Sequence, residues 1–415
     1  MNDVLHTAAM ALAQRGPSSS GIAARPSLER ALSAIRTHLD MEVAFISEFV
    51  DGHRVFRHVD ARSADAPVKV GASDPLEDSY CQRVVDGRLP ELITDACLNA
   101  EALTLAATRA LPVGAHLSVP IRLADGRIYG TFCCFSRLAD PTLTQRDLDM
   151  MRVFAQMAAD EIQDELSALE ARRALEDRIE AVCSAGGLSM VYQPIVDVAS
   201  ARIGGFESLA RFSPLPLRSP DVWFAEAALV GRAIELETKA IRLALAALKQ
   251  LPPDIYLTVN TSPETIVHGH FAAVLEGHPL DRIVVEVTEH QAVERYEDIA
   301  AVMLPLQSQG LRVAIDDAGA GYASFRHILN LHPNIVKMDY SITHRIDSDR
   351  SRRALAAAMH GFASETGCNI VAEGVETPAE LETLRDLGIV KAQGYHLGRP
   401  MPLEQAQGLV GRSIH

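Results

Sequence analysis

The sequence predicts an α/β protein in which a C-terminal (β/α)8 barrel follows a smaller N-terminal α+β domain. Three observations support this fold class. Short apolar runs alternate with helical stretches from about residue 188 onward, helical and strand-like segments alternate between about residues 28 and 150, and a long helical stretch separates the two parts. At 415 residues the chain is also too long for one ordinary hydrophobic core.

The barrel prediction depends on the number and order of strand-like runs in the C-terminal part. Helical stretches such as "ELETKAIRLALAALKQL" lie between most of them. Strands that alternate with helices in this way favour a (β/α)8 barrel, and no GxGxxG motif of an open dinucleotide-binding sheet follows the first strand. The eight runs are "MVYQPIVD", "IGGFESLARF", "IYLTVNTS", "RIVVEVTE", "RVAIDDAG", "NIVKMD", "NIVAEGVE" and "KAQGYHLG".

The N-terminal part reads as one antiparallel sheet with helices packed on it. The segment "HLSVPIRLADGRIYGTFCCFS" predicts a hairpin with its turn at Asp125 and Gly126, because an Asp-Gly pair suits a tight β-turn. "SLERALSAIRTHL" precedes it as a helix. A single small α+β domain accounts for this order of elements.

A stretch from about residue 145 to 183 without Gly or Pro predicts a long helix. Its apolar residues recur at nearly heptad spacing, which leaves two interpretations open. The helix packs on one domain as an amphipathic helix, or it pairs with a second copy as a parallel connector in a homodimer. The apolar positions are Met151, Phe154, Ala158, Ile162, Leu166, Leu169, Leu175, Ile179 and Val182.

We therefore divide the chain into five parts. Residues 1–27 form an N-terminal helix and flexible link, 28–150 the small domain, 151–184 the helical connector, 185–408 the barrel, and 409–415 a C-terminal tail.

Composition restricts the partners and the compartment. The net charge of −15 argues against binding to polymeric nucleic acid, and no apolar run reaches the roughly 20 residues that span a membrane. The six cysteines form no CxxC pair, so a reducing cytoplasm is the expected setting. An acidic protein can still bind a small anionic ligand if divalent cations lie between the two.

Polar residues follow the predicted barrel strands one after another. The carboxyl ends of barrel strands meet at one rim, so we expect these side chains to converge. Taken singly, each fits a solvated or capping residue, but seven successive strands that end this way point to a site. The residues are Glu207 with Arg211, Asn260, Glu286 with Glu289, Asp316 with Asp317, Lys337 with Asp339, Glu373 with Glu376, and Gln393.

So many carboxylates at one rim would raise one another's pKa values unless cations offset the repulsion. Carboxylate and amide oxygens suit Mg²⁺ or Mn²⁺, and the absence of His and Cys from the set makes zinc less suitable. Two such metals could clamp a phosphodiester and supply a nucleophilic water. A sugar-processing barrel with paired acids is an alternative, but it does not explain Asn260 and Lys337.

The C-terminal region closely resembles the EAL-domain family of cyclic di-GMP phosphodiesterases. The resemblance covers roughly residues 185–408 and rests on blocks such as "GFESLARF", "VEVTE", "DDAGAGYASF", "VAEGVET" and "AQGYHLGRPMP" in the family's order. It implies a barrel with one reversed strand, two Mg²⁺ or Mn²⁺ ions, a homodimer, and hydrolysis of cyclic di-GMP to linear pGpG. By the same resemblance the metal ligands are Glu207, Asn260, Glu286, Asp316 and Asp317.

The resemblance also implies roles for residues around the metals. Lys337 would orient or activate the attacking water, and Glu373 and Gln393 would contact metal-bound water and position the reactants. Arg211 would contact substrate phosphate, and Glu289 would steady the loop after the Asp pair. We therefore expect Lys337, Glu373 and Glu207 to be catalytic, and Arg211 and Gln393 to bind substrate.

Two residues depart from the family's pattern. Ser208 stands where Ala is usual in the signature triplet, and Ala318 stands where Phe is usual in the loop. Neighbours in a strand face opposite sides, so Ser208 should point away from Glu207 with little effect. The missing aromatic could loosen the loop and lower the basal rate. An inactive barrel that serves as a cyclic di-GMP receptor is the alternative, although each matched ligand position keeps a suitable side chain.

The N-terminal region resembles a GAF domain, a small-ligand sensor module, through the order of its elements and "LSVPIRLADGRIYGTFCCFS". This resemblance implies a regulatory domain with an undefined small ligand or a purely dimerising role. No GGDEF block occurs in the sequence, so synthase activity is not expected.

Overall fold

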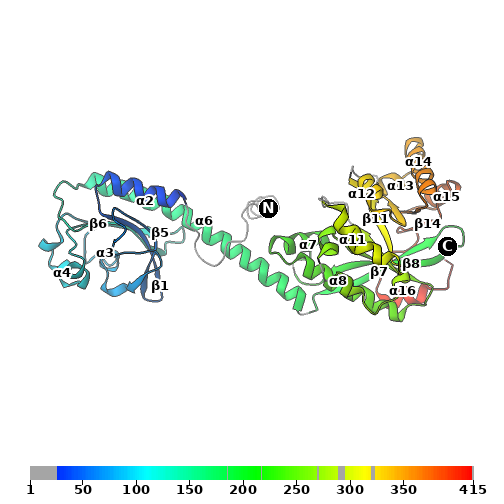
Figure 1. Ribbon diagram of the computed structural model, residues 1–415, viewed down its shortest axis with the longest axis horizontal. Coiled ribbons are helices and arrows are strands. Elements are labelled where there is room, and N and C mark those ends of the chain that lie inside the picture. The colour runs from blue at the N-terminus through cyan, green and yellow to red at the C-terminus, as the bar shows by residue number, and fades with distance from the viewer. Residues whose placement is uncertain are drawn as a thin grey trace. The chain divides into compact units, whose positions relative to one another are not determined.

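The structure is a computed structural model that describes residues 26–184, 186–215, 217–268, 271–287, 295–318 and 323–413, apart from the side chains of residues 26, 317 and 323–325. The chain divides into two compact units, Met1–Arg172 and Arg173–His415. We call them unit 1 and unit 2 and describe each by itself (Figure 1).

Unit 1 is built on a six-stranded sheet in the order β3-β2-β1-β6-β5-β4, in which every pair is antiparallel. The predicted hairpin is confirmed as β5 and β6, and Gly126 takes a positive φ of 85° in its turn. The strands are β1 (Val43–Val50), β2 (His53–Ala61), β3 (Ser73–Pro75), β4 (Leu92–Ile93), β5 (Ala115–Arg122) and β6 (Ile128–Ser136).

The two faces of this sheet pack differently. One face contributes residues such as Ile46, Leu117 and Phe132 to an apolar core with two helices, α2 (Pro26–His38) and α6 (Gln145–Ser184). The opposite face packs on the short helices of the β2–β5 connection and carries buried polar side chains as well as Phe45 and Phe56. These helices are α3 (Tyr80–Val85), α4 (Ala100–Thr104) and α5 (Ala106–Ala110).

Helix α6 confirms the predicted long helix and belongs to both units. Met151, Ala158 and Ile162 are buried in unit 1, and Ile179 and Val182 are buried in unit 2. The heptad-like apolar positions at both ends are therefore used within the chain itself, as the amphipathic-helix interpretation requires. Leu169, between these ends, is 43 % exposed.

Unit 2 is a closed barrel of eight strands in the order β10-β11-β12-β13-β14-β7-β8-β9, as predicted. β7 is antiparallel to both of its neighbours, and all other pairs are parallel, so the one reversed strand is also confirmed. The strands are β7 (Leu188–Asp197), β8 (Arg202–Phe212), β9 (Tyr256–Thr261), β10 (Ile283–Val287), β11 (Arg312–Ala318), β12 (Ile335–Met338), β13 (Asn369–Ala372) and β14 (Lys391–Ala392).

Helices pack against the outside of the barrel, where outward-facing strand residues such as Val285, Ile315 and Val336 join one continuous apolar core. The helices are α7 (Pro220–Leu229), α8 (Ala233–Ala246), α9 (Pro263–Val267), α10 (Phe271–Leu275), α11 (Tyr296–Gln307), α12 (Ala323–Leu331), α13 (Tyr340–Thr343), α14 (Arg350–Thr366), α15 (Pro378–Asp386) and α16 (Leu403–Leu409).

An apolar layer fills the barrel interior. Gly205 allows this packing, because a Cβ at that position would come within 2.6 Å of the Tyr256 ring from the next strand. The layer consists of Ile195, Tyr256, Val284, Ala314, Ile335 and Val371. In each strand, the next residue that faces inward packs on this layer.

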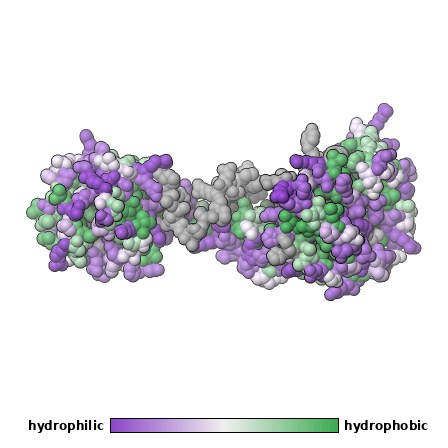
Figure 2. All heavy atoms as spheres, viewed as in Figure 1, coloured by the Kyte–Doolittle hydropathy of each residue, from purple (hydrophilic) through white to green (hydrophobic). Residues whose placement is uncertain are grey.

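The surface of each unit mixes hydrophilic and hydrophobic residues on the face drawn in Figure 2. Among the described residues, no helix has the length and apolar character needed to cross a membrane.

Candidate active site

A polar layer lies directly above the apolar layer inside the barrel. Side chains alternate between the two sides of a strand, so the residue two positions further along faces the interior again. In four parallel strands this step leads from an apolar residue to an ionisable one. The pairs are Val284 and Glu286 in β10, Ala314 and Asp316 in β11, Ile335 and Lys337 in β12, and Val371 in β13 with Glu373, the residue directly after that strand.

Lys337 lies at the centre of this layer with its side chain only 2 % exposed. Its ammonium contacts four carboxylates from different strands. The distances from Nζ are 2.8 Å to Glu373 Oε1, 2.9 Å to Asp316 Oδ1, 3.0 Å to Glu286 Oε2 and 3.5 Å to Glu207 Oε1.

Glu207 is held from both sides by amide side chains. The Gln393 amide donates to Glu207 Oε2 and, at 3.1 Å, to Gln193 Oε1, and the Asn260 amide lies 3.4 Å from Glu207 Oε1. Gln193 in turn donates to the carbonyl of Gly398. These contacts fix the Glu207 carboxylate over Lys337.

Burial and mutual repulsion shift the pKa values of the site. Burial raises the pKa of Glu286 well above its usual range. The charge of Lys337 lowers this pKa, but the negative charges of the neighbouring carboxylates raise it again. The pKa of Glu373 is raised for the same reasons, chiefly by burial. Burial lowers the pKa of Lys337, but the surrounding carboxylates outweigh it and raise that pKa well above its usual value. Lys337 is therefore an ammonium at neutral pH.

The donor set suits a hard divalent cation, since it consists of carboxylates and one side-chain amide. One ammonium cannot compensate four carboxylates if all of them ionise, which is why the pKa values of Glu286 and Glu373 are raised when no cation is bound. Within the described part of the chain, however, no three His, Cys, Asp or Glu side chains are arranged to hold a metal ion. The structure instead shows Lys337 between the carboxylates, where it offsets part of their repulsion.

The structure corrects the prediction that each polar residue ends its strand. Glu207 lies in the middle of β8 and Arg211 lies within the same strand, because the β7–β8 pairing continues up to Phe212. Asp316 lies inside β11 and not in the turn after it. Asp339 lies outside the polar layer and caps α13, where its carboxylate accepts a hydrogen bond from the amide of Ser341.

Two of the predicted residues lie wholly or partly outside the described part of the chain. Glu289 lies outside the described residues, and only the backbone of Asp317 is described, as part of β11. Arg211 faces the same side of β8 as Glu207, four residues further on, and its guanidinium donates to the carbonyl of Ala210. Ser208 points away from Glu207 as expected and donates a hydrogen bond to the carbonyl of Thr258.

Gln193 belongs to this cluster and the sequence analysis missed it. β7 runs opposite to the other strands, so its polar residue lies two positions before Ile195 in the apolar layer. The signal was a glutamine inside the buried run "YQPIVD", paired in register with Glu207.

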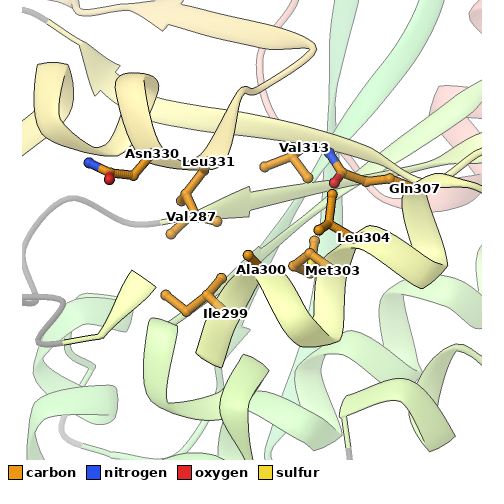
Figure 3. A pocket seen from close by; sticks show the side chains of 9 residues that line it. All are labelled: Val287, Ile299, Ala300, Met303, Leu304, Gln307, Val313, Asn330 and Leu331. Carbon is orange, nitrogen blue, oxygen red and sulfur yellow. The ribbon is translucent and has the colours of Figure 1, made fainter. Parts of the chain in front are cut away.

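A separate hollow lies on the outer side of the barrel, between α11, the end of β10 and α12 (Figure 3). Its lining is apolar apart from Gln307 and Asn330, and no lining residue is ionisable. The chemistry of the molecule is therefore associated with the polar layer inside the barrel.

The family model of the EAL domain matches residues 172–400, and that of the GAF domain matches residues 25–162. The chain belongs to the EAL domain family. Its N-terminal unit carries the GAF domain that the sequence analysis expected.

Curated relatives match somewhat more than half of the chain. A cyclic di-GMP phosphodiesterase of Pseudomonas aeruginosa is 27 % identical over 246 residues, which are 56 % of this chain and 42 % of that protein. An uncharacterized protein of Sinorhizobium fredii is 30 % identical over 251 residues, 58 % of this chain and 30 % of that protein. The chain thus spans less than half the length of these curated relatives.

Solved structures agree with this assignment. The PaMucR phosphodiesterase in complex with c-di-GMP is 26 % identical with a TM-score of 0.51, and it covers 56 % of this chain and 99 % of that chain. The EAL enzyme Bd1971 in its cAMP-bound form shares the fold, with a TM-score of 0.55, 19 % identity, and coverage of 89 % of this chain and 93 % of that chain.

Proposed function

We propose that the barrel hydrolyses one phosphodiester bond of cyclic di-GMP to give pGpG, with Mg²⁺ or Mn²⁺ as cofactor. The observation that carries this proposal is the buried layer in which a single ammonium faces four carboxylates inside an EAL barrel. Such an excess of negative charge favours the binding of divalent cations, and these in turn attract a phosphodiester.

The proposed metal-holding residues are those that carry oxygen donors toward the barrel interior. Bound cations would supply Lewis-acid polarisation of the phosphate and would offset the carboxylate charge. The residues are Glu207, Asn260, Glu286 and Asp316, together with Asp317, which follows in β11.

Lys337 and Glu373 have different roles in this proposal. Lys337 stays protonated because of its raised pKa, so it donates hydrogen bonds that orient a water or a phosphate oxygen and does not accept a proton. Glu373, 2.8 Å from Lys337, has a raised pKa and can hold a proton near neutral pH. Gln393 and Gln193 keep Glu207 in place.

A product assay tests the proposal. The full chain is incubated with cyclic di-GMP and Mg²⁺ or Mn²⁺, and chromatography follows the appearance of pGpG. Formation of pGpG that a chelator abolishes supports the proposal. Tight binding of cyclic di-GMP without product would favour the alternative of a receptor, and neither binding nor product would refute both.

Regulation by unit 1 and dimerisation are part of the same proposal. Unit 1 buries polar side chains on one face of its sheet, which is consistent with a sensing role. If unit 1 regulates the barrel, Arg54→Gln, a change confined to unit 1, should alter the turnover of cyclic di-GMP by the full chain. Light scattering measures the oligomeric state, and unchanged turnover together with a monomer would count against both parts.

A further inference from the structure

Unit 1 buries a pair of cysteines on the polar face of its sheet. Cys81 lies on α3 and Cys133 on β6, both are 0 % exposed, and their Sγ atoms are 3.4 Å apart. The two thiols are therefore in direct contact although 52 residues separate them in the sequence. A disulfide between them requires a small further approach of the two sulfur atoms.

Arg54 makes these two thiols chemically unequal. Its Nη1 lies 3.1 Å from Cys81 Sγ, and its guanidinium packs over the rings of Phe45 and Phe56. Burial raises the pKa of Cys81, but the contacts with Cys133 and the charge of Arg54 outweigh it and lower that pKa well below its usual range. Burial raises the pKa of Cys133, and its contact with Cys81 adds to the effect. The contact with Arg54 therefore favours the thiolate at Cys81, while Cys133 keeps its proton more readily.

Arg54 lies between the buried Cys81 and a carboxylate that is partly exposed to solvent. Arg54 also binds Asp74, with 2.9 Å between Nε and Oδ1, and the side chains of Arg54 and Asp74 are 9 % and 41 % exposed. Arg54 thus links the buried Cys81 to a carboxylate that solvent reaches, and we infer that a peroxide approaches Cys81 when this contact with Asp74 breaks.

We propose that Cys81 and Cys133 are a modification site at which a hydroperoxide forms a reversible disulfide. The Cys81 thiolate attacks one peroxide oxygen, the O–O bond breaks, and the leaving oxygen takes a proton, which gives Cys81 sulfenic acid and water or an alcohol. The Cys133 sulfur then attacks the sulfenic sulfur, and the S–OH oxygen leaves as water with the Cys133 proton. Two thiols are oxidised, one peroxide is reduced, and a dithiol reductant restores the pair.

Mass spectrometry of the folded full chain tests this proposal. Reduced protein is treated with hydrogen peroxide, free thiols are alkylated, and tryptic peptides are mapped with and without reductant. We expect a loss of two hydrogen masses and a reductant-sensitive link between the peptide of Cys81 and the peptide of Cys133. Absence of this link, with Cys81 and Cys133 still free to alkylate after unfolding, would overturn the proposal.

Cys134 provides a matched control. It is the neighbour of Cys133 in β6, is also 0 % exposed, and lies on the opposite, apolar face beside Met151. Cys133 and Cys134 fall in one tryptic peptide, between Arg127 and Arg137, so substitutions must distinguish them. Cys134→Ser should keep the link, and Cys133→Ser and Cys81→Ser should lose it. If the link persists in Cys133→Ser, Cys133 is not the partner of Cys81 and the proposal is wrong.

The role of Arg54 is tested by the rate of the reaction. Arg54→Gln removes the positive charge, so we expect disulfide formation at pH 7 to slow by about tenfold or more and its pH dependence to move to higher pH. An unchanged rate and pH profile in a folded variant would show that Arg54 does not activate Cys81.

Discussion

Each unit buries a cation against anions, but the balance of charge differs. In unit 2 the ammonium of Lys337 faces four carboxylates, whereas in unit 1 the guanidinium of Arg54 faces the carboxylate of Asp74 and the thiol of Cys81. In the first set one ammonium faces several carboxylates, so protons or, as we propose, divalent cations offset the remaining repulsion. In the second set the carboxylate of Asp74 is partly exposed to solvent, so fewer charges are buried together, and the change that we propose there is covalent. We therefore propose that the first set binds cations and that the second does not.

The largest expected effect tests the site in the barrel. Glu207→Gln keeps the size of the side chain but removes a charged oxygen donor, so hydrolysis of cyclic di-GMP should fall about a thousandfold, or about 4 kcal/mol of transition-state stabilisation. Formation of pGpG measures the effect. Glu264→Gln, an exposed change on α9, is the matched control and should leave the rate unchanged. Equal rates in both variants would remove Glu207 from the proposed metal site.

The next prediction compares the two buried cations directly. Lys337→Met leaves four carboxylates without their ammonium, so the metal-free unit 2 should lose about 3–5 kcal/mol of stability, and Mn²⁺ should restore much of it. Arg54→Met should destabilise unit 1 without any response to Mn²⁺. Hydrogen exchange measured peptide by peptide separates the two units. An equal Mn²⁺ response in both variants would contradict the charge-balance argument.

A third prediction is that acid shifts the stability of the two units in opposite directions. His116 lies buried on the polar face of unit 1, where burial and then the charge of Arg54 lower its pKa to about 3. The unfolded chain binds that proton below about pH 6.5, so His116 alone should cost unit 1 about 2 kcal/mol between pH 7 and pH 5, and the lowered pKa of Cys81 adds a loss in the same direction. In unit 2 burial raises the pKa of Glu373 to about 8, so the metal-free barrel should gain stability over the same interval.

The same exchange measurement at several pH values checks both trends. His116→Gln should reduce the slope of the curve of unit 1, and Glu373→Gln should reduce that of metal-free unit 2. Parallel curves for the two units of the unchanged protein would show that other groups control their acid response.

The smallest expected effect concerns Ser208, which departs from the family's usual Ala. Its hydroxyl donates to the carbonyl of Thr258 on the outer side of β8, so Ser208→Ala should cost about 1 kcal/mol of stability and change turnover less than twofold. Thermal unfolding and the pGpG assay measure the two quantities. A large change in turnover would mean that the outer side of β8 influences the Glu207 carboxylate.

The sequence predicted the barrel and most of its site because the strands repeat one pattern. In β10 to β13 an apolar inward residue precedes an ionisable one by two positions, which the chain order reveals directly. The pattern failed where a strand is reversed or extended. Gln193 lies on the reversed β7, and β8 continues five residues beyond Glu207 to Phe212.

The thiol pair of unit 1 could not be predicted in this way. Cys81 and Cys133 come from a helix and a strand that only tertiary packing brings together, and Arg54 comes from a third element. The alternation of Cys133 and Cys134 along β6 was readable, but the face on which charge would be buried was not.

The position of the Tyr256 ring bears on how small molecules could reach the interior of the barrel. It fills the space over Gly205, and the cations of Arg312 and Lys391 lie 4.5 Å and 4.6 Å from its centre. The ring belongs to the apolar layer that fills the interior below the carboxylates. Under the proposed function, substrate would therefore arrive and product would leave on the carboxylate side of this layer, so the two would compete for the same opening.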